Sequence, residues 1–270
     1  MNWWGKLIGG ALGLALGGGP LGALLGAAIG HSFDKGMANI ENFSGANQEE
    51  IQAAFFAATF SIMGRLAKSD GQVSRVEIQV AQDTMSKMQL SDEQRQAAMN
   101  LFNQGKQEDF DYLSAIDDLK RVCGRRTNLL RMFMEIQLTT ALADGELHPN
   151  EQTLLFDIAE HLGFQKRQFE QLLAMMTAQQ RFSGFEYGTT EPVSEAQTIR
   201  AAYETLGLQS DCSDAELKKA YRRLISQHHP DKLVSKGLPE EMMKIATEKT
   251  REIKDAYERI KKFRAQASRG

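Results

Sequence analysis

Cysteine is scarce in this sequence of 270 residues, which has only Cys123 and Cys212. Neither belongs to a CxxC pair, and no other residue stands at the spacing of a metal ligand. This pattern excludes a disulfide framework and a zinc ribbon. We therefore expect two reduced, unreactive thiols in a reducing compartment, with no metal site and no cofactor.

The motifs of common catalytic sites are also missing. There is no nucleophile constellation, and the glycines of residues 5–30 form no phosphate loop because no Lys-Ser or Lys-Thr pair follows them. The Asp-x-Asp-x-Asp-Gly pattern of a calcium loop does not occur. We expect a protein that is not an enzyme.

Charge is absent from residues 7–30, although 25% of the chain is charged. Twenty-four residues of helix span about 36 Å, enough to cross the hydrocarbon core of a bilayer. A signal peptide would need a more basic start than the single Lys6, and a glycine-rich loop would not explain the leucines and isoleucines. The sequence favours one transmembrane helix over 7–30, after a short extracytoplasmic segment at 1–6.

Glycines recur at every fourth position of this segment, on two ridges that include Gly9, Gly13, Gly18, Gly22 and Gly26. Ridges of small residues allow close approach of helices in a membrane, so we expect a homodimer through these glycines. The flanking charges, Lys6 on one side and Asp34 and Lys35 on the other, nearly balance and do not orient the span.

The most informative stretch lies near the end of the chain, at 213–232. Ser213 and Glu216 have the spacing of a capping box, which predicts the start of a helix. At 100° per residue, one face of that helix is apolar and the other is basic. The basic face carries Lys218, Lys219, Arg222 and Arg223.

The tripeptide His229-Pro230-Asp231 follows the basic helix. Because Pro230 disfavours helix at the residue before it, we expect the helix to end near Gln227 or His228 and the tripeptide to form a loop. We expect His228, near the apolar face, to be structural.

The run Ala-Tyr-Arg-Arg-Leu at 220–224, followed by His-Pro-Asp, resembles the J-domain of the DnaJ co-chaperone family. The resemblance covers 199–270 and predicts a short helix, the basic helix, and a long antiparallel helix after Pro239. It implies binding to a DnaK-class ATP-dependent chaperone and stimulation of its ATP hydrolysis. The four basic residues with His229, Pro230 and Asp231 would make the contact. The sequence has no Gly/Phe-rich segment and no CxxCxGxG region, unlike full-length DnaJ.

The region at 47–178 repeats itself with an offset of 74 residues, so that Asp70-Gly71 aligns with Asp144-Gly145. Apolar positions on both sides keep the same offset. Each half is predicted to contain a helix, an Asp-Gly turn, a second helix and a third. We expect an all-α bundle with pseudo-twofold symmetry, between linkers at 31–46 and 179–198.

The two turns resemble the TerB tellurite-resistance family. That resemblance implies a metal-responsive or partner-binding acidic patch made of Asp70, Glu77, Asp144 and Glu151. The alternative, which we favour, is that these residues cap helices and turns, because both glutamates stand three positions into a helix start.

Charge is unevenly distributed along the chain. Residues 201–270 hold 15 basic and 11 acidic side chains, whereas the whole chain has a net charge of −3. A basic end on an acidic body favours an acidic partner. Nucleic acid is disfavoured because acidic residues alternate with the basic ones after Pro239 and no aromatic stacking motif appears.

An anchor, a TerB-like domain and a J-domain in this order resemble the bacterial membrane-anchored DnaJ-like co-chaperones, over essentially the whole chain. The resemblance implies an inner-membrane protein with a periplasmic N-terminus and cytoplasmic soluble domains. A rival interpretation is a membrane stress-sensing scaffold whose TerB-like domain binds metal or an envelope partner. The sequence names no client protein.

Overall fold

The computed structural model describes residues 46–69, 75–143, 147–187 and 194–267. Within these ranges the secondary structure is helical and there is no strand, which confirms the all-α class. None of the helices in these ranges is long and apolar enough to span a bilayer. The transmembrane helix expected at 7–30, with its glycine ridges, lies outside the described residues.

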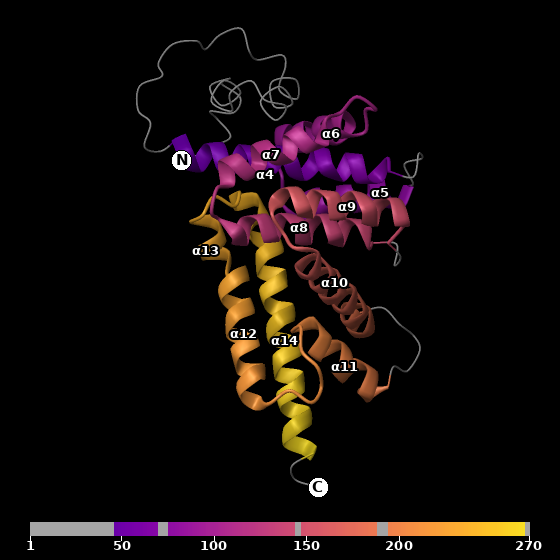
Figure 1. Cartoon of the computed structure of the whole chain (residues 1–270), viewed down its shortest axis with the longest axis vertical. Helices are drawn as coiled ribbons and strands as arrows, with labels where there is room; N and C mark the ends of the chain where they lie inside the picture. The colour runs from indigo at the N-terminus through magenta and orange to yellow at the C-terminus, as the bar shows by residue number, and fades with distance from the viewer. Residues whose placement is uncertain (1–45, 70–74, 144–146, 188–193, 268–270) are drawn as a thin grey trace.

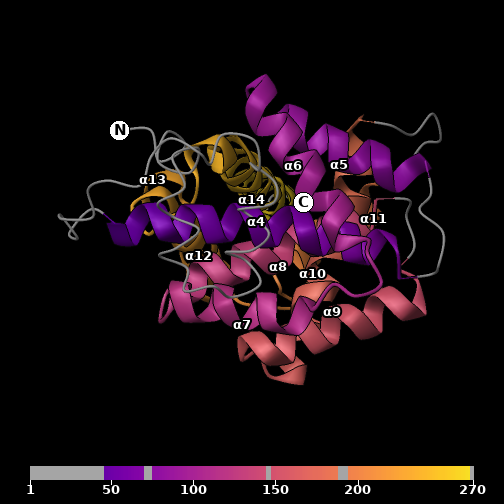
Figure 2. The same cartoon turned by 90° about the horizontal axis from the view of Figure 1, so that it is seen from above.

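Seven helices build the central domain within the described ranges (Figures 1 and 2). The first half contains α4 (Ala46–Ala67), α5 (Arg75–Lys87) and α6 (Asp92–Gly105). The second half contains α8 (Thr127–Ala141), α9 (Pro149–Leu162) and α10 (Lys166–Tyr187), and the amphipathic helix α7 (Tyr112–Cys123) connects the halves.

The helix boundaries confirm the internal repeat. Helices α4 and α8 end at 67 and 141, α5 and α9 begin at 75 and 149, and α6 and α10 begin at 92 and 166, each pair 74 positions apart. The third helix expected in each half is therefore present, and the two halves share one plan.

Helix α4 forms the centre of this domain, and every residue from 51 to 64 is buried. It crosses α6 at two glycines. A Cβ atom at Gly64 would overlap the backbone of Phe102, and one at Gly105 would overlap the backbone of Ser61. Glycine at both positions thus lets the two helix backbones approach directly.

The C-terminal domain is a helical hairpin with a short helix at its side. It consists of α11 (Glu195–Thr205), α12 (Asp214–His228), α13 (Pro230–Val234), a 3₁₀ turn (Glu240–Met242) and α14 (Met243–Ala267). Tyr221 stacks on Tyr257 with ring centroids 4.2 Å apart, and Leu224 is buried in the same apolar cluster as Ile253 and Ala256. This is the antiparallel packing that the sequence predicts.

Helices extend further into the expected linker at 179–198 than the sequence pattern indicates. Helix α10 continues to Tyr187, and α11 begins at Glu195 because Ser194 and Gln197 form a capping box. Gln180 donates to the carbonyl of Leu142, a contact that helps hold α10 beyond its periodic part.

The end of the hairpin that carries α13 meets the central domain (Figure 1), where α12 contacts α8 and Gln48 of α4 donates a 3.3 Å hydrogen bond to the Val234 carbonyl of α13. Leu233, Leu238, Met242 and Ala246 belong to the same buried apolar cluster as the central helices. The two domains therefore share a core at the end of the hairpin that carries the His-Pro-Asp residues.

Candidate functional site: the basic helix and the His-Pro-Asp segment

The start of α12 has the capping box that the sequence predicts. The Glu216 carboxylate accepts a hydrogen bond of 2.8 Å from the Ser213 backbone, and the Ser213 hydroxyl accepts one of 3.3 Å from the Glu216 backbone. These bonds to Ser213 lower the pKa of Glu216. The helix then buries Leu217, Ala220 and Leu224 against α14.

The opposite face of α12 is open to solvent. Its four basic residues are all exposed: Lys218, Lys219, Arg222 and Arg223. At (i, i+4) spacing, Lys218 and Arg222 form one column and Lys219 and Arg223 form another. The structure thus presents the cationic surface that the sequence predicts, next to the end of the helix.

The His-Pro-Asp residues do not form the expected loop. Helix α12 ends at His228, and only His229 has a non-helical conformation, with φ −59° and ψ 122°. Pro230 is already the first residue of α13, and Asp231 lies in its first turn. The physical reason is that proline suits the first position of a helix, where its missing N–H is not needed.

The side chains of His229 and Asp231 face outward from this corner. That of Asp231 is 85% exposed and that of His229 is 43% exposed, with 4.0 Å between the His229 Nδ1 atom and the Asp231 carboxylate. The His229 Nδ1 atom is itself buried and has no hydrogen-bond partner among the described residues. The Asp231 carboxylate and the exposed part of the His229 ring are therefore the groups that a partner could contact.

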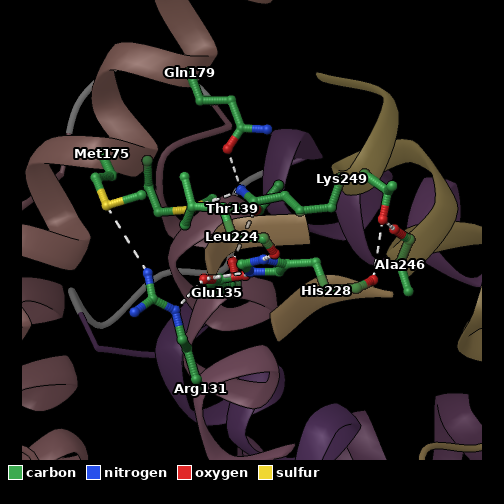
Figure 3. Close-up of polar contacts among 11 residues, drawn as sticks. Arg131, Glu135, Thr139, Met175, Gln179, Leu224, His228, Ala246 and Lys249 are labelled. Atoms are coloured by element: carbon green, nitrogen blue, oxygen red, sulfur yellow. Dashed lines mark hydrogen bonds and ion pairs between the residues drawn. The ribbon is translucent and has the colours of Figure 1, made fainter. Parts of the chain in front are cut away.

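His228, the residue before the tripeptide, faces inward and is structural, as expected (Figure 3). Its Nδ1 atom lies 2.8 Å from the Leu224 carbonyl, and its Nε2 atom lies 2.7 Å from a carboxylate oxygen of Glu135 in helix α8. Its own carbonyl accepts a 3.0 Å hydrogen bond from the Thr250 hydroxyl in α14. Three helices thus fix the residue that precedes the His-Pro-Asp segment.

Glu135 lies at the centre of a buried charged network between the domains. Burial alone would raise its pKa, but His228, Lys249 and Arg131 outweigh this and hold the pKa of Glu135 well below its usual range. The Arg131 guanidinium donates to Glu135 over 2.9 Å. Lys249 donates to Gln179 and to the Met176 sulfur, and burial lowers the pKa of its ammonium group.

Sequence reasoning missed Glu135. It pairs with a residue 93 positions away, a contact that no local periodicity reports. The available signal was a single carboxylate within the otherwise apolar run Met132–Ile136. A buried charge needs a partner, so this position could have been marked as a contact between elements.

The acidic residues of the TerB-like turns are only partly covered by the structure. Asp70 and Asp144 lie outside the described residues, and the side chain of Glu77 is not described. Glu151 is buried and accepts a 3.0 Å hydrogen bond from the backbone of His148 at the start of α9. This contact is the helix-capping role that we favour for Glu151.

Models of three protein families match the chain in succession. They are the Co-chaperone DjlA transmembrane domain over residues 1–40, Tellurite resistance protein TerB over 56–174, and the DnaJ domain over 201–266. Proteins named Co-chaperone protein DjlA from Salmonella paratyphi A and Escherichia coli K12 are both 44% identical to it, over 265 and 266 residues. The one from Yersinia pestis is 41% identical over 272 residues, and each alignment covers 97% of this chain and 98% of the relative.

The chain belongs to the DjlA co-chaperone family. It is a membrane-anchored co-chaperone with a TerB-like central domain and a DnaJ domain. No solved structure matches it.

Proposed function

We propose that this co-chaperone recruits a DnaK-class ATP-dependent chaperone to the membrane and stimulates its ATP hydrolysis. The observation that carries the proposal is that two exposed features follow one another. The four basic residues of α12 are exposed, and this helix leads into the partly exposed His229 and the exposed Asp231, at a corner whose inner side is fixed by buried contacts.

The basic face would bring the two proteins together. Four exposed cationic side chains on one helix steer an acidic surface into contact, and this raises the association rate more than the final affinity. Arg222 and Arg223 stand nearest the corner among them. Binding through this face should weaken as salt screens the charges.

The His-Pro-Asp segment would make the contacts that stimulate ATP hydrolysis in the chaperone. Pro230 fixes the start of α13, while His229 and Asp231 offer polar groups to the partner. Neither residue is a catalyst in this chain, because hydrolysis of ATP takes place in the chaperone.

The anchor would confine this activity to one surface of the cell. A DnaK-class chaperone with ATP works in the cytoplasm, so we place the soluble domains there, with a single span at 7–30 and residues 1–6 in the periplasm. Confinement raises the effective concentration of the J-domain for chaperone and clients near the membrane.

We also propose that the anchor forms a homodimer through its glycine ridges. Gly9 and Gly13 lie on one ridge, and Gly18, Gly22 and Gly26 lie on the other. In a membrane two-hybrid assay, replacing the last three by leucine should abolish self-association. Unchanged self-association would remove this part of the proposal.

Flotation of lipid vesicles tests recruitment. The full-length protein would be reconstituted with a DnaK-class chaperone whose own ATPase activity is disabled, so that it stays ATP-bound. We expect the chaperone to float with wild-type vesicles in ATP, less so at high salt, and not with Arg222→Glu. Lys254→Glu is a matched control, because it reverses an exposed charge of the same domain on α14, outside the basic face. Absence of flotation with wild type, or equal loss in both variants, would contradict the proposal.

A further inference from the structure

One side chain of the central domain, Glu135, contacts the helix that leads into the signalling corner, which is the junction of α12 and α13 with residues 229–231. Glu135 lies on α8 and contacts His228 on α12 with both carboxylate oxygens, at 2.7 and 3.0 Å. The side chains of His228 and Glu135 are only 3% and 4% exposed. Both partners of the contact are therefore buried between the two domains.

Both ring nitrogens of His228 lie against acceptors. The Leu224 carbonyl is within 2.8 Å of Nδ1 and the Glu135 carboxylate is within 2.7 Å of Nε2, so the ring is held at two points. The pair is a charge-assisted, directional contact, stronger than a neutral hydrogen bond.

Contacts with the two neighbouring helices restrain the backbone of His228 as well as its side chain. The ring of His228 is held by Glu135, and its carbonyl is held by the Thr250 hydroxyl. The next peptide leads into His229, the one non-helical residue between α12 and α13. Fixing His228 therefore fixes the direction in which the His-Pro-Asp segment leaves the basic helix.

Further contacts support the same corner from the central domain. Gln94 donates to Glu241 over 2.6 Å, and Gly237, with φ +109°, lies against Ile51 so closely that a Cβ atom would overlap it. These contacts hold the segment after α13, and Gln48 of α4 holds α13 itself through a hydrogen bond to the Val234 carbonyl. Glu135 is the one that touches the residue directly before the tripeptide.

We propose that Glu135 is a positioning residue for the J-domain signal. From the central domain it orients His228, and through it the segment 229–231, relative to the basic face of α12. The inference rests on the proposed action on a DnaK-class chaperone. It adds that the TerB-like domain participates in that action as part of the signalling corner.

Stability alone does not account for the pair. Replacing a buried ion pair by well-packed apolar side chains is often neutral or stabilising. The charged pair instead supplies a fixed direction, which apolar contacts do not. This difference separates a positioning role from a merely structural one.

The test uses the full-length protein in micelles and single-turnover ATP hydrolysis by a DnaK-class chaperone. The variants are Glu135→Leu, the double variant Glu135→Leu/His228→Leu, and the conservative Glu135→Gln, which keeps an acceptor. We expect the two leucine variants to lower the maximal stimulation by about fivefold or more. The concentration that gives half-maximal stimulation should stay the same, because the basic face is unchanged, and Glu135→Gln should recover most of the stimulation.

A second measurement reports on the backbone at His229 in the absence of the chaperone. Selective ¹⁵N-histidine labelling reports on the five histidines of the chain. We expect the backbone resonance of His229 to shift in Glu135→Leu. Leu155→Ala is the control, because it makes a cavity in the core of the central domain and lowers its stability without contact to α12, and there the His229 resonance should stay in place.

The possible outcomes separate this inference from the proposed function. If folded leucine variants stimulate as well as wild type, or if the His229 resonance does not move, Glu135 is not a positioning residue. The inference is also overturned if Leu155→Ala lowers the maximal stimulation to the same extent. If wild type itself does not stimulate, the proposed function fails, and the histidine spectra still decide whether Glu135 orients the corner.

Discussion

Cys123 and Cys212 differ in their surroundings, although the sequence predicts the same inert role for both. Cys123 is buried, and burial raises its pKa to about 12, with a smaller opposing effect of Arg126. Cys212 is only half-buried, and its sulfur lies 3.3 Å from the Arg264 guanidinium. Burial, which local sequence does not report, separates the two thiols.

This difference predicts selective labelling. At pH 8, a water-soluble disulfide reagent should modify Cys212 in the folded protein and leave Cys123 unmodified until urea unfolds the chain, because the thiolate is the nucleophile. Mass spectrometry of the two cysteine peptides measures this. The pKa of Cys123 is higher in the folded protein than in the unfolded chain, so ionisation of this thiol favours unfolding. The protein should therefore lose stability as the pH rises above the pKa of an unfolded thiol. Labelling of Cys123 at the rate of Cys212 would contradict the buried position.

At the same scale, the sequence predicted the exposed residues of the site better than the buried ones. The basic side chains and the His-Pro-Asp tripeptide are adjacent in the chain, so their proximity follows from helix periodicity. The pairing of Glu135 with His228 depends on how two domains pack, and periodicity carries no information about that. Contacts of this kind require the tertiary structure.

Among the helices, the repeat of 74 residues predicted the order of the central elements because each half uses the same turn and the same apolar positions. The short helix α13 was not predicted, since Pro230 was interpreted as ending a helix when it also begins the next one. The crossing of α4 and α6 was not predicted either. A glycine within a helical pattern does not reveal which backbone will pass beside it.

Replacing Gly64 at the crossing of α4 and α6 should change the stability of the protein in two opposite ways. On helix propensity alone, Gly64→Ala should stabilise the protein by about 1 kcal/mol. Here the added methyl group would overlap the backbone of Phe102, and overpacking of this kind costs about 1–3 kcal/mol, or more against rigid backbone. We expect a net loss in the free energy of unfolding, measured by urea denaturation.

A control for this prediction is the double variant Gly64→Ala/Gly105→Ala. Because both glycines serve one crossing, the two losses should not add, unlike those of distant sites. A gain in stability for Gly64→Ala would show that the helices do not cross at these glycines.

For the molecule as a whole, the structure makes the two soluble domains one unit. The end of the hairpin with the signalling residues lies against the central domain (Figure 1). It shares an apolar core with that domain, and the basic residues of α12 remain exposed. The sequence predicted two domains and a linker but not their relative position. Leu233, Leu238 and Met242 fit the apolar pattern of a hairpin equally well, and only the structure shows that they also meet the central helices.

The central claim is that this chain stimulates a DnaK-class chaperone through its His-Pro-Asp segment, and single-turnover ATP hydrolysis tests it most directly. Wild type, His229→Gln and the control His161→Gln would be compared as full-length proteins, with folding checked by circular dichroism. We expect wild type and His161→Gln to accelerate hydrolysis by about tenfold or more, equivalent to about 1.4 kcal/mol of the barrier, and His229→Gln to have no effect. No acceleration by folded wild type, or equal acceleration by His229→Gln, would contradict the claim.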